Sequence, residues 1–240
     1  MSVEVLTKCS VKDLREMRKK MWTPDVVAAH LRELDPFLLR KWDHAFTVFF
    51  DMNKDNKLEW ADFEELIRRV RENRGEQSQD YIKALSAMKD IWKQLSGEAD
   101  INADDQVSVD EWKHMWFATI RNETDAAWQK LYLDYMFSLF DSSGDEVIDL
   151  SEYIEVMNWY GIERKQAIWA FDKFAKGPKG QPVTAISYET YCALWKDFFQ
   201  SLDKSKPGNY IFGDATGEYD PSTIPDSPPM SEGEESEEEQ

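Results

Sequence analysis

Apolar residues recur three and four residues apart along most of the chain, in segments separated by short polar stretches. That spacing places them on one face of an α-helix. The helices it predicts lie at about 37–50, from 60 to beyond 70, and at 81–95, 109–120, 131–140, 153–159, 164–176 and 188–202. The pattern therefore predicts an all-α fold in which helices alternate with polar loops.

Three of these loops repeat one spacing of oxygen atoms over twelve residues, at 51–62, 100–111 and 141–152. Positions 1, 3, 5, 9 and 12 carry oxygen-bearing side chains, and position 7 offers its backbone carbonyl. The candidate ligands are Asp51, Asn53, Asp55, Lys57, Glu59, Asp62; Asp100, Asn102, Asp104, Gln106, Ser108, Glu111; and Asp141, Ser143, Asp145, Val147, Asp149, Glu152. A hard divalent cation takes six to eight oxygen ligands, so each loop is predicted to bind Ca²⁺. With a helix on either side, each unit reads as an EF-hand.

Two positions depart from the usual motif. Position 6 is normally glycine, because the backbone turns there with a positive φ, but this chain has Asn56, Asp105 and Glu146. Asn and Asp tolerate that conformation better than Glu, so strain is expected at Glu146. Position 12 of the first loop is Asp62, whose shorter carboxylate favours a smaller octahedral ion, so Mg²⁺ is expected to compete there. The alternative is that a loop is retained only as a turn and binds no ion, and the first is the strongest candidate for that.

A fourth helix–loop–helix unit is expected after the third, because EF-hands pair through position 8 of their loops. Leu58, Val107 and Ile148 hold that position, and Ile186 is the candidate partner of Ile148. The loop between the last two helices has no acidic residue over 176–183, so it is expected to pair without binding a cation. The architecture predicted is four EF-hand units in two packed pairs, with short antiparallel loop strands.

The chain divides by composition into five parts. They are predicted to be an N-terminal helical extension (1–36), the first two hands (37–121), the last two hands (126–203), an apolar segment (204–213) and a disordered acidic tail (214–240). The segment 11–22 alternates basic and apolar residues, which fits either a helix that binds a membrane surface or resembles a calmodulin target, or a helix that packs on the body. Ser227, Ser231 and Ser236 are candidate phosphorylation sites in a tail that otherwise serves solubility.

Charge and cysteine content narrow the function. The net charge is −18, and ten acids but no base lie in 214–240, which argues against nucleic-acid binding. Cys9 and Cys192 suit neither a disulfide framework nor a metal site. The first residues lack the apolar core of a signal peptide, and no run of apolar residues is long enough to span a membrane. A monomeric cytoplasmic protein is expected.

The chain resembles the family of calexcitin and the sarcoplasmic calcium-binding proteins. The resemblance covers about 37–213, and the segments that carry it are 100–116, 135–141, 160–162, the acid-free fourth loop and 208–213. It implies a compact protein whose two EF-hand pairs pack together. It also implies calcium-dependent signalling of the calexcitin type, with a membrane channel as a target, or calcium and magnesium buffering of the sarcoplasmic type.

An enzyme is the alternative from another class. Related four-hand photoproteins place His, Trp and Tyr together, whereas the last helix here has Tyr191 and Trp195 but no His. GTP binding, sometimes attributed to calexcitin, is not expected, because Gly177-Pro178-Lys179-Gly180 is too short for a phosphate-binding loop. A nucleotide hydrolase would need a nucleophile and base, and no such pair is visible. The chain is expected not to be an enzyme and to have no catalytic residues.

Overall fold

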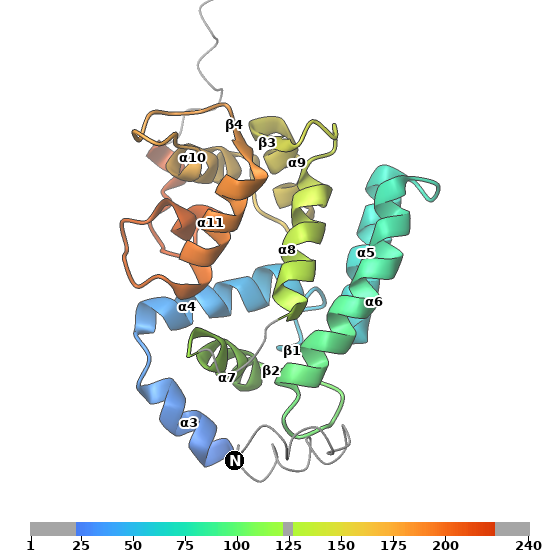
Figure 1. Ribbon diagram of the computed structural model, residues 1–240, viewed down its shortest axis with the longest axis vertical. Helices are drawn as coiled ribbons and strands as arrows, with labels where there is room; N and C mark the ends of the chain where they lie inside the picture. Colours follow the sequence, from blue (N-terminus) through green and yellow to red (C-terminus); the bar gives the residue numbers. More distant parts are fainter. Residues whose placement is uncertain (1–22, 122–126, 224–240) are drawn as a thin grey trace, which may run out of the picture.

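The computed structural model describes residues 23–121 and 127–223, and the fold is all-α with two short strand pairs (Figure 1). The helices are α3 (Pro24–Arg32), α4 (Pro36–Ala45), α5 (Trp60–Arg74), α6 (Gln79–Ala99), α7 (Val109–Ile120), α8 (Ala127–Phe140), α9 (Leu150–Trp159), α10 (Arg164–Phe174) and α11 (Tyr188–Gln200). Short 3₁₀ turns follow at Pro207–Tyr210 (η2) and Pro221–Thr223 (η3). The basic segment 11–22 lies outside the described residues.

Side-chain caps explain why several helices begin where they do. An oxygen at the N-cap accepts a hydrogen bond from an N–H of the first turn that has no partner inside the helix. The capping residues are Asp35, Ser78, Ser108, Asp149 and Ser187. Ser108, Asp149 and Ser187 are position 9 of their loops, so this loop position is also the N-cap of the outgoing helix.

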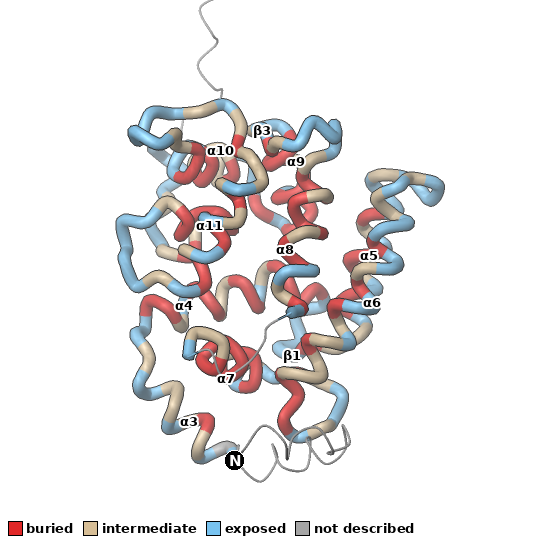
Figure 2. The backbone as a smooth tube through the Cα atoms, in the orientation of Figure 1, coloured by how far each residue is buried: buried red, intermediate tan, exposed pale blue. Residues whose placement is uncertain are grey.

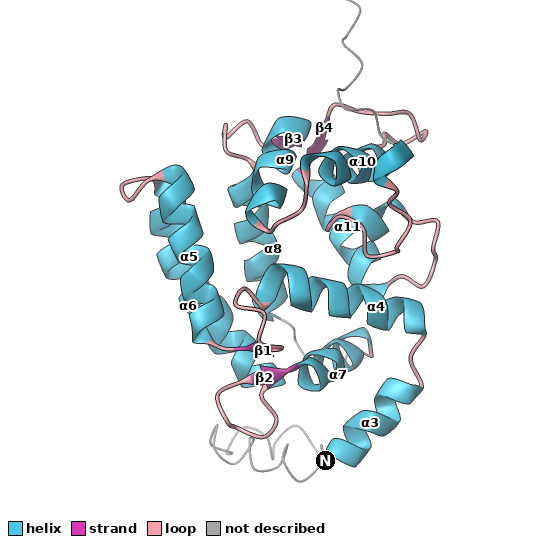
Figure 3. Cartoon of the chain, turned by 180° about the vertical axis from the view of Figure 1, so that it is seen from behind, coloured by secondary structure: helices cyan, strands magenta, loops and turns pink. Residues whose placement is uncertain are grey.

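The loops pair as expected. β1 (Lys57–Leu58) runs antiparallel to β2 (Val107–Ser108), with Leu58 opposite Val107. β3 (Val147–Asp149) runs antiparallel to β4 (Ala185–Ser187), with Ile148 opposite Ile186. Figure 3 shows the two strand pairs at separate places in the molecule, one between the first and second loops and one between the third and fourth. Position 8 therefore brings the loops together in twos.

One continuous apolar core joins the two halves of the molecule. Buried residues lie on helices of both halves (Figure 2). Aromatic rings from distant parts of the chain meet in it: Trp116 stacks on Phe199 with centroids 4.0 Å apart, and Phe49 lies 4.6 Å from Phe212. Phe50 stacks on Tyr132 at 4.5 Å. Such ring pairs add about 0.5–1.5 kcal/mol each beyond the area they bury. The two EF-hand pairs therefore share a core rather than hanging as separate lobes.

The helix that enters the first loop ends in a π-helix, Phe46–Phe50, which the apolar pattern did not predict. The N–H of Asp51 donates to the carbonyl of Phe46, five residues back, at 2.8 Å. This wider turn sits directly before position 1 of the first loop, and π-turns of this kind occur often at functional sites. The predicted single helix over 37–50 is thus an α-helix followed by a π-turn.

The segment after α11 folds back into the core. Tyr210, Ile211 and Phe212 are buried. The tail, however, was predicted to begin at 214, and the structure gives 214–223 definite contacts. Asp214 accepts hydrogen bonds from the N–H groups of Thr216, Gly217, Glu218 and Tyr219, which turns the chain so that Tyr219 packs against Trp169. Composition missed this because the turn depends on the hydrogen bonds of one acid, Asp214, and on the long-range contact of Tyr219.

Membrane-spanning helices were searched for over the described part of the chain. No helix there combines the length and the apolar content needed to cross a bilayer.

Candidate metal centres

The carboxylate at position 1 organises the first half of all three acidic loops. Asp51 accepts hydrogen bonds from the N–H groups of positions 5 and 6, at 3.1 and 3.0 Å. Asp100 accepts from positions 4, 5 and 6 at 2.6, 3.3 and 3.1 Å, and Asp141 from the same positions at 2.8, 3.1 and 3.1 Å. The loop backbone therefore wraps around this carboxylate.

The carboxylate at position 12 closes each loop from the other side. Asp62 accepts from the N–H groups of Met52 and Asn53 at 2.9 and 3.2 Å, and from Glu59 at 2.9 Å. Glu111 and Glu152 make the corresponding bonds to the start of their loops and to position 9. The residue at position 12 thus links the beginning of its loop to the outgoing helix, which fixes the direction in which that helix leaves.

Two positions in each loop have a left-handed backbone. Position 6 does so as expected, with φ of 66° at Asn56, 62° at Asp105 and 68° at Glu146. Position 4 does so as well, which was not predicted: φ is 63° at Lys54, 57° at Ala103 and 76° at Gly144. These two turns point successive N–H groups at the position 1 carboxylate, so the conformation follows from the hydrogen bonds described above.

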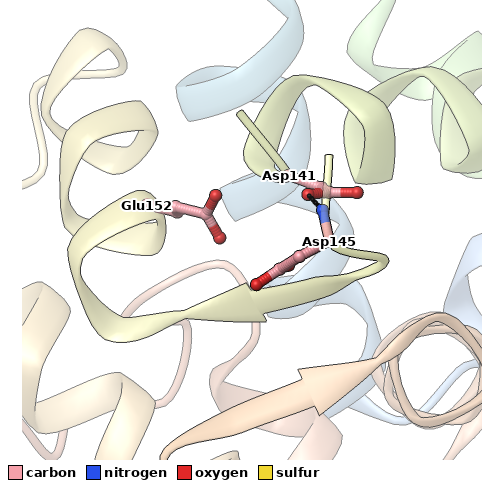
Figure 4. A group of neighbouring side chains, drawn as sticks. All are labelled: Asp141, Asp145 and Glu152. Atoms are coloured by element: carbon pink, nitrogen blue, oxygen red, sulfur yellow. Dashed lines mark hydrogen bonds between the residues drawn. The ribbon is translucent and has the colours of Figure 1, made fainter. Parts of the chain in front are cut away.

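The third loop brings three carboxylates together. Asp141, Asp145 and Glu152 each present an oxygen, and these atoms lie within 4.8 Å of one another. Figure 4 shows the Glu152 carboxylate reaching across the loop toward Asp141 and Asp145. Oxygens that share one Ca²⁺ at about 2.3–2.6 Å lie at most about 5 Å apart, so the cluster fits that ion. In the described part of the chain, no other group of three or more acidic, His or Cys side chains is gathered so closely.

The first loop buries its two end carboxylates, with Asp51 and Asp62 both 1% exposed. Burial raises the pKa of Asp62, the negative charge of Asp51 adds to that rise, and the three backbone N–H donors oppose it. Two buried carboxylates raise the free energy of the charged site. The nearby charge of Lys54 offsets part of that cost, and a cation between the carboxylates would offset more. The first loop is therefore built from the same end groups as the third.

The second loop shows the same electrostatics and also contacts the first. Burial raises the pKa of Asp100, with a smaller contribution from the charge of Glu111, against the pull of its backbone donors. The Gln106 side chain at position 7 donates to the Glu59 carboxylate at position 9 of the first loop, at 3.4 Å. This contact joins the two loops beside the β1–β2 pair.

The remaining candidate ligands bond within their own loops. Asn53 and Asn102 at position 3 accept from the N–H of position 5 through their side-chain oxygens and donate their amides to Asp55 and Asp104. Asp149 caps α9 by accepting from Glu152 at 2.9 Å, and Ser108 caps α7 in the same way. Ser143 donates its backbone N–H to Glu152. Lys57 and Val147 enter the strands, and only their backbone carbonyls are candidate ligands.

The fourth loop is closed by backbone and amide groups instead of acids. The N–H of Gly177 donates to the carbonyl of Gln181 at 2.7 Å, and the N–H of Lys179 donates to the Gln181 side chain at 3.1 Å. Ser187 at position 9 accepts from the N–H of Thr190 at position 12. The loop keeps the strand and the cap of an EF-hand but has hydrogen-bonding groups where the others have carboxylates.

Comparisons with known sequences identify calcium-binding relatives. No protein-family model matches the chain. The chain is 36% identical over 189 residues to calexcitin-1 of Caenorhabditis elegans, which covers 79% of this chain and 92% of that protein. It is 40% identical over 126 residues to the sarcoplasmic calcium-binding proteins I, III and IV of Branchiostoma lanceolatum, covering 50% of this chain and 68% of theirs.

Comparison with solved structures gives a similar result to the comparison of sequences. A sarcoplasmic calcium-binding protein from amphioxus superposes with a TM-score of 0.64 at 29% identity, over 75% of this chain and 98% of that one. Aequorin superposes with a TM-score of 0.56 at 15% identity, over 75% and 94% of the two chains, a likeness of fold alone.

Proposed function

The chain belongs to the family of calexcitin and the sarcoplasmic calcium-binding proteins, and from this we propose that it binds Ca²⁺ at three EF-hand loops, 51–62, 100–111 and 141–152. One observation carries the proposal. In all three loops the carboxylate at position 1 accepts from the N–H groups of positions 5 and 6, and the carboxylate at position 12 accepts from those of positions 3 and 9. The fourth loop lacks both carboxylates.

A bound cation would have two effects on these loops, one on their charge and one on the outgoing helices. Bound Ca²⁺ offsets the repulsion between acids that the loops hold close together, as with Asp51 and Asp62. Asp62, Glu111 and Glu152 each stand on the first turn of an outgoing helix, so a change in their position moves that helix. The proposed ligands are the oxygens at positions 1, 3, 5, 7, 9 and 12 of each loop.

Calcium titration calorimetry on single-site variants tests the number of sites. The parent protein is expected to bind three Ca²⁺, and Glu111→Gln and Glu152→Gln two each, because an amide replaces a charged ligand. Glu189→Gln is the matched control: it makes the same change beside position 12 of the fourth loop, and its count stays at three. A Glu152→Gln variant with an unchanged count would refute this assignment.

The first loop is proposed to accept Mg²⁺ as well, because Asp62 reaches less far than the Glu of the other loops.

Signalling of the calexcitin type is the preferred role, in the cytoplasm and as a monomer, with a protein target such as a membrane channel. Its support is the similarity to calexcitin-1 over nearly that protein's whole length. The absence of a catalytic role belongs to the same proposal, and a GTP turnover assay that gave steady hydrolysis would contradict it.

Buffering is the second candidate, favoured by the core that the two EF-hand pairs share. A sensor must expose apolar surface when it binds Ca²⁺, whereas a buffer need not. A dye that fluoresces on apolar surface, titrated with Ca²⁺ in the presence of Mg²⁺, separates the two roles. A large rise supports signalling, and a flat signal together with three bound Ca²⁺ supports buffering.

A further inference from the structure

Two arginines of α5 reach across to α9, the helix that follows the third acidic loop. Arg69 donates from Nη1 to the backbone carbonyl of Trp159, the last residue of α9. Arg74 donates to the Glu155 carboxylate at 2.8 Å, and its guanidinium carbon lies 5.0 Å from the centre of the Trp159 ring. These four residues form the α5–α9 bridge. Each helix packs mainly along another one, α5 along α6 and α9 along α10, so the bridge is a connection made by side chains.

The contacts of the bridge are of kinds that attract a cation. The last carbonyls of a helix have no partner inside it and carry the negative end of the helix dipole, so Arg69 of α5 caps the end of α9. The Arg74 side chain is only 15% exposed and lies between a carboxylate and an aromatic face, both of which bind a guanidinium. The bridge therefore favours one orientation of α5 relative to α9.

Both bridged helices begin at a carboxylate that closes a candidate calcium loop. Asp62 stands on the first turn of α5, and Glu152 stands on the first turn of α9. At about 1.5 Å per residue, Arg69 and Arg74 lie about 10 and 18 Å beyond Asp62 along one continuous helix. A rotation of α5 at its first turn therefore displaces both arginines, and a rotation of α9 displaces the other side of the bridge.

We propose that the α5–α9 bridge couples Ca²⁺ binding at the first loop to Ca²⁺ binding at the third. This inference rests on the proposed calcium sites and adds a connection between two of them. The strand pairs do not supply that connection, because β1 pairs with β2 and β3 pairs with β4.

The sign of the coupling follows from the conformation in which the bridge forms. There, Asp62 and Glu152 already accept hydrogen bonds from the start of their own loops. An ion at either loop stabilises this placement of its position 12 carboxylate and of the outgoing helix, and the bridge then favours the same placement in the other loop. Binding at one loop therefore raises the affinity of the other, and the effect is reciprocal.

Calorimetric Ca²⁺ titration of proteins with one or two active sites measures this coupling. Glu111→Gln disables the second loop and leaves two sites. Adding Glu152→Gln leaves the first site alone, and adding Asp62→Asn leaves the third alone. The coupling factor is the overall association constant for both ions in the two-site protein, divided by the product of the constants of the two one-site proteins. We expect a factor of about five, at the low end of the usual range because the bridge is partly exposed to solvent.

Arg69→Met with Arg74→Met, introduced into all three proteins, is expected to reduce the factor from about five to about one. The loss of two positive charges also changes the affinity of each site, but that change enters the numerator and the denominator alike and cancels. Arg68→Met with Arg71→Met is the matched control and leaves the factor at about five. These two arginines lie on the same helix, and in the described part of the chain neither has a hydrogen bond or an ion pair to α9.

A second arm changes the bridge from the side of α9. Glu155→Gln removes the ion pair with Arg74 and keeps the bond from Arg69, so the factor is expected to fall to about two. Glu163→Gln at the N-cap of α10 makes the same chemical change outside the bridge and leaves the factor at about five. The Glu155 side chain is 41% exposed, so this arm decides the question if the double arginine variant does not fold.

The numbers of bound ions separate this inference from the proposed sites. Counts of two, one and one confirm that the three proteins carry the intended sites. With those counts, a factor near one, or a factor that both bridge variants leave at about five, would overturn the coupling and leave the calcium sites standing. Different counts would contradict the sites themselves, and the coupling with them.

Discussion

At the scale of single residues, Glu146 holds a backbone conformation that its side chain disfavours. Its φ is 68°, and a left-handed backbone costs a residue with a Cβ about 1–2 kcal/mol. Glycine removes that cost but adds about 0.5–1 kcal/mol of unfolded-state entropy. We expect Glu146→Gly to raise the free energy of unfolding by about 0.5–1 kcal/mol, measured in urea without Ca²⁺. Asn56→Gly at φ 66° is the control, and an equal gain there would contradict the argument, since Asn tolerates this conformation.

The proposed Mg²⁺ tolerance of the first loop rests on the short side chain of Asp62. Asp62→Glu adds one methylene, which extends the reach of the carboxylate and favours two-oxygen coordination of the larger Ca²⁺. We expect the variant to bind Ca²⁺ more tightly at one site and to lose competition by Mg²⁺ there. Calorimetric Ca²⁺ titrations with and without Mg²⁺ measure both effects. If Mg²⁺ competes equally in parent and variant, the length of this side chain does not set the preference.

The sequence predicted the special positions of the three loops because the spacing of the twelve-residue motif is a local property. Asn56, Asp105 and Glu146 were recognised as left-handed positions from the motif alone. The turn at position 4 was missed, because Lys54 and Ala103 have no preference for positive φ. Asp51 and Asp100, which gather the N–H groups of the following residues, impose that conformation. The preference of Lys and Ala for negative φ is overridden by these hydrogen bonds, which form only in the folded loop.

At the scale of elements, the fourth helix–loop–helix unit contacts the third loop through the β3–β4 strand pair. Ile186 is 2% exposed and lies opposite Ile148 of the proposed calcium loop. Ile186→Ala removes buried apolar contacts, so we expect it to lower the free energy of unfolding by about 2–5 kcal/mol. It should also weaken Ca²⁺ binding at the third loop, although Ile186 is no candidate ligand. Thr184→Ala, exposed in the same loop, is the control. Unchanged affinity in a destabilised Ile186→Ala protein would show that the strand supports the fold alone.

The helices and the strand partners were predictable because both follow from local sequence: the spacing of apolar residues predicts the helices, and the apolar residue at position 8 of each loop predicts the strand partners. The π-turn at Phe46–Phe50 was not, because five consecutive residues of mostly apolar character look the same in an α-helix and in a π-helix. The difference lies in the bond from Asp51 to Phe46, which depends on where the first loop is anchored. The start of the tail was misjudged for a related reason: Tyr219 is held by Trp169, fifty residues earlier.

At the scale of the whole molecule, side chains of α4 hold the C-terminal part of the described chain. Lys41 donates to the carbonyls of Asp197 and Ser201 and to the side chain of Asn209, at 3.2, 2.7 and 2.9 Å. Its neighbours behave alike: Trp42 donates to the Phe199 carbonyl, Arg40 to that of Thr216, and His44 bonds to that of Phe212. The partners lie 156 to 176 residues away in sequence, so no local pattern could reveal this clamp.

Lys41 makes the clamp depend on pH. Its side chain is fully buried, and burial lowers its pKa to about 8, against the opposing charge of Asp197. Between pH 8 and the ordinary value of 10.5 the unfolded chain holds a proton that the folded protein has lost. Over that window the folded state gains stability as pH rises. In Lys41→Met the buried carbonyls lose their hydrogen-bond donor, which we expect to lower the free energy of unfolding by about 2–3 kcal/mol at pH 7. The variant also lacks the group that titrates.

The difference in unfolding free energy between parent and Lys41→Met is therefore expected to widen from pH 8 to 10.5. Urea unfolding of both proteins across that range measures this difference. Subtracting one free energy from the other cancels the contribution of tyrosine titration, because both proteins have the same tyrosines. Lys196→Met, an exposed lysine on α11, is the control and should give a flat difference. A flat or narrowing difference for Lys41→Met would mean that Lys41 keeps its proton in the core. The clamp would then hold the two halves together through a buried charge instead of a group that changes charge within that range.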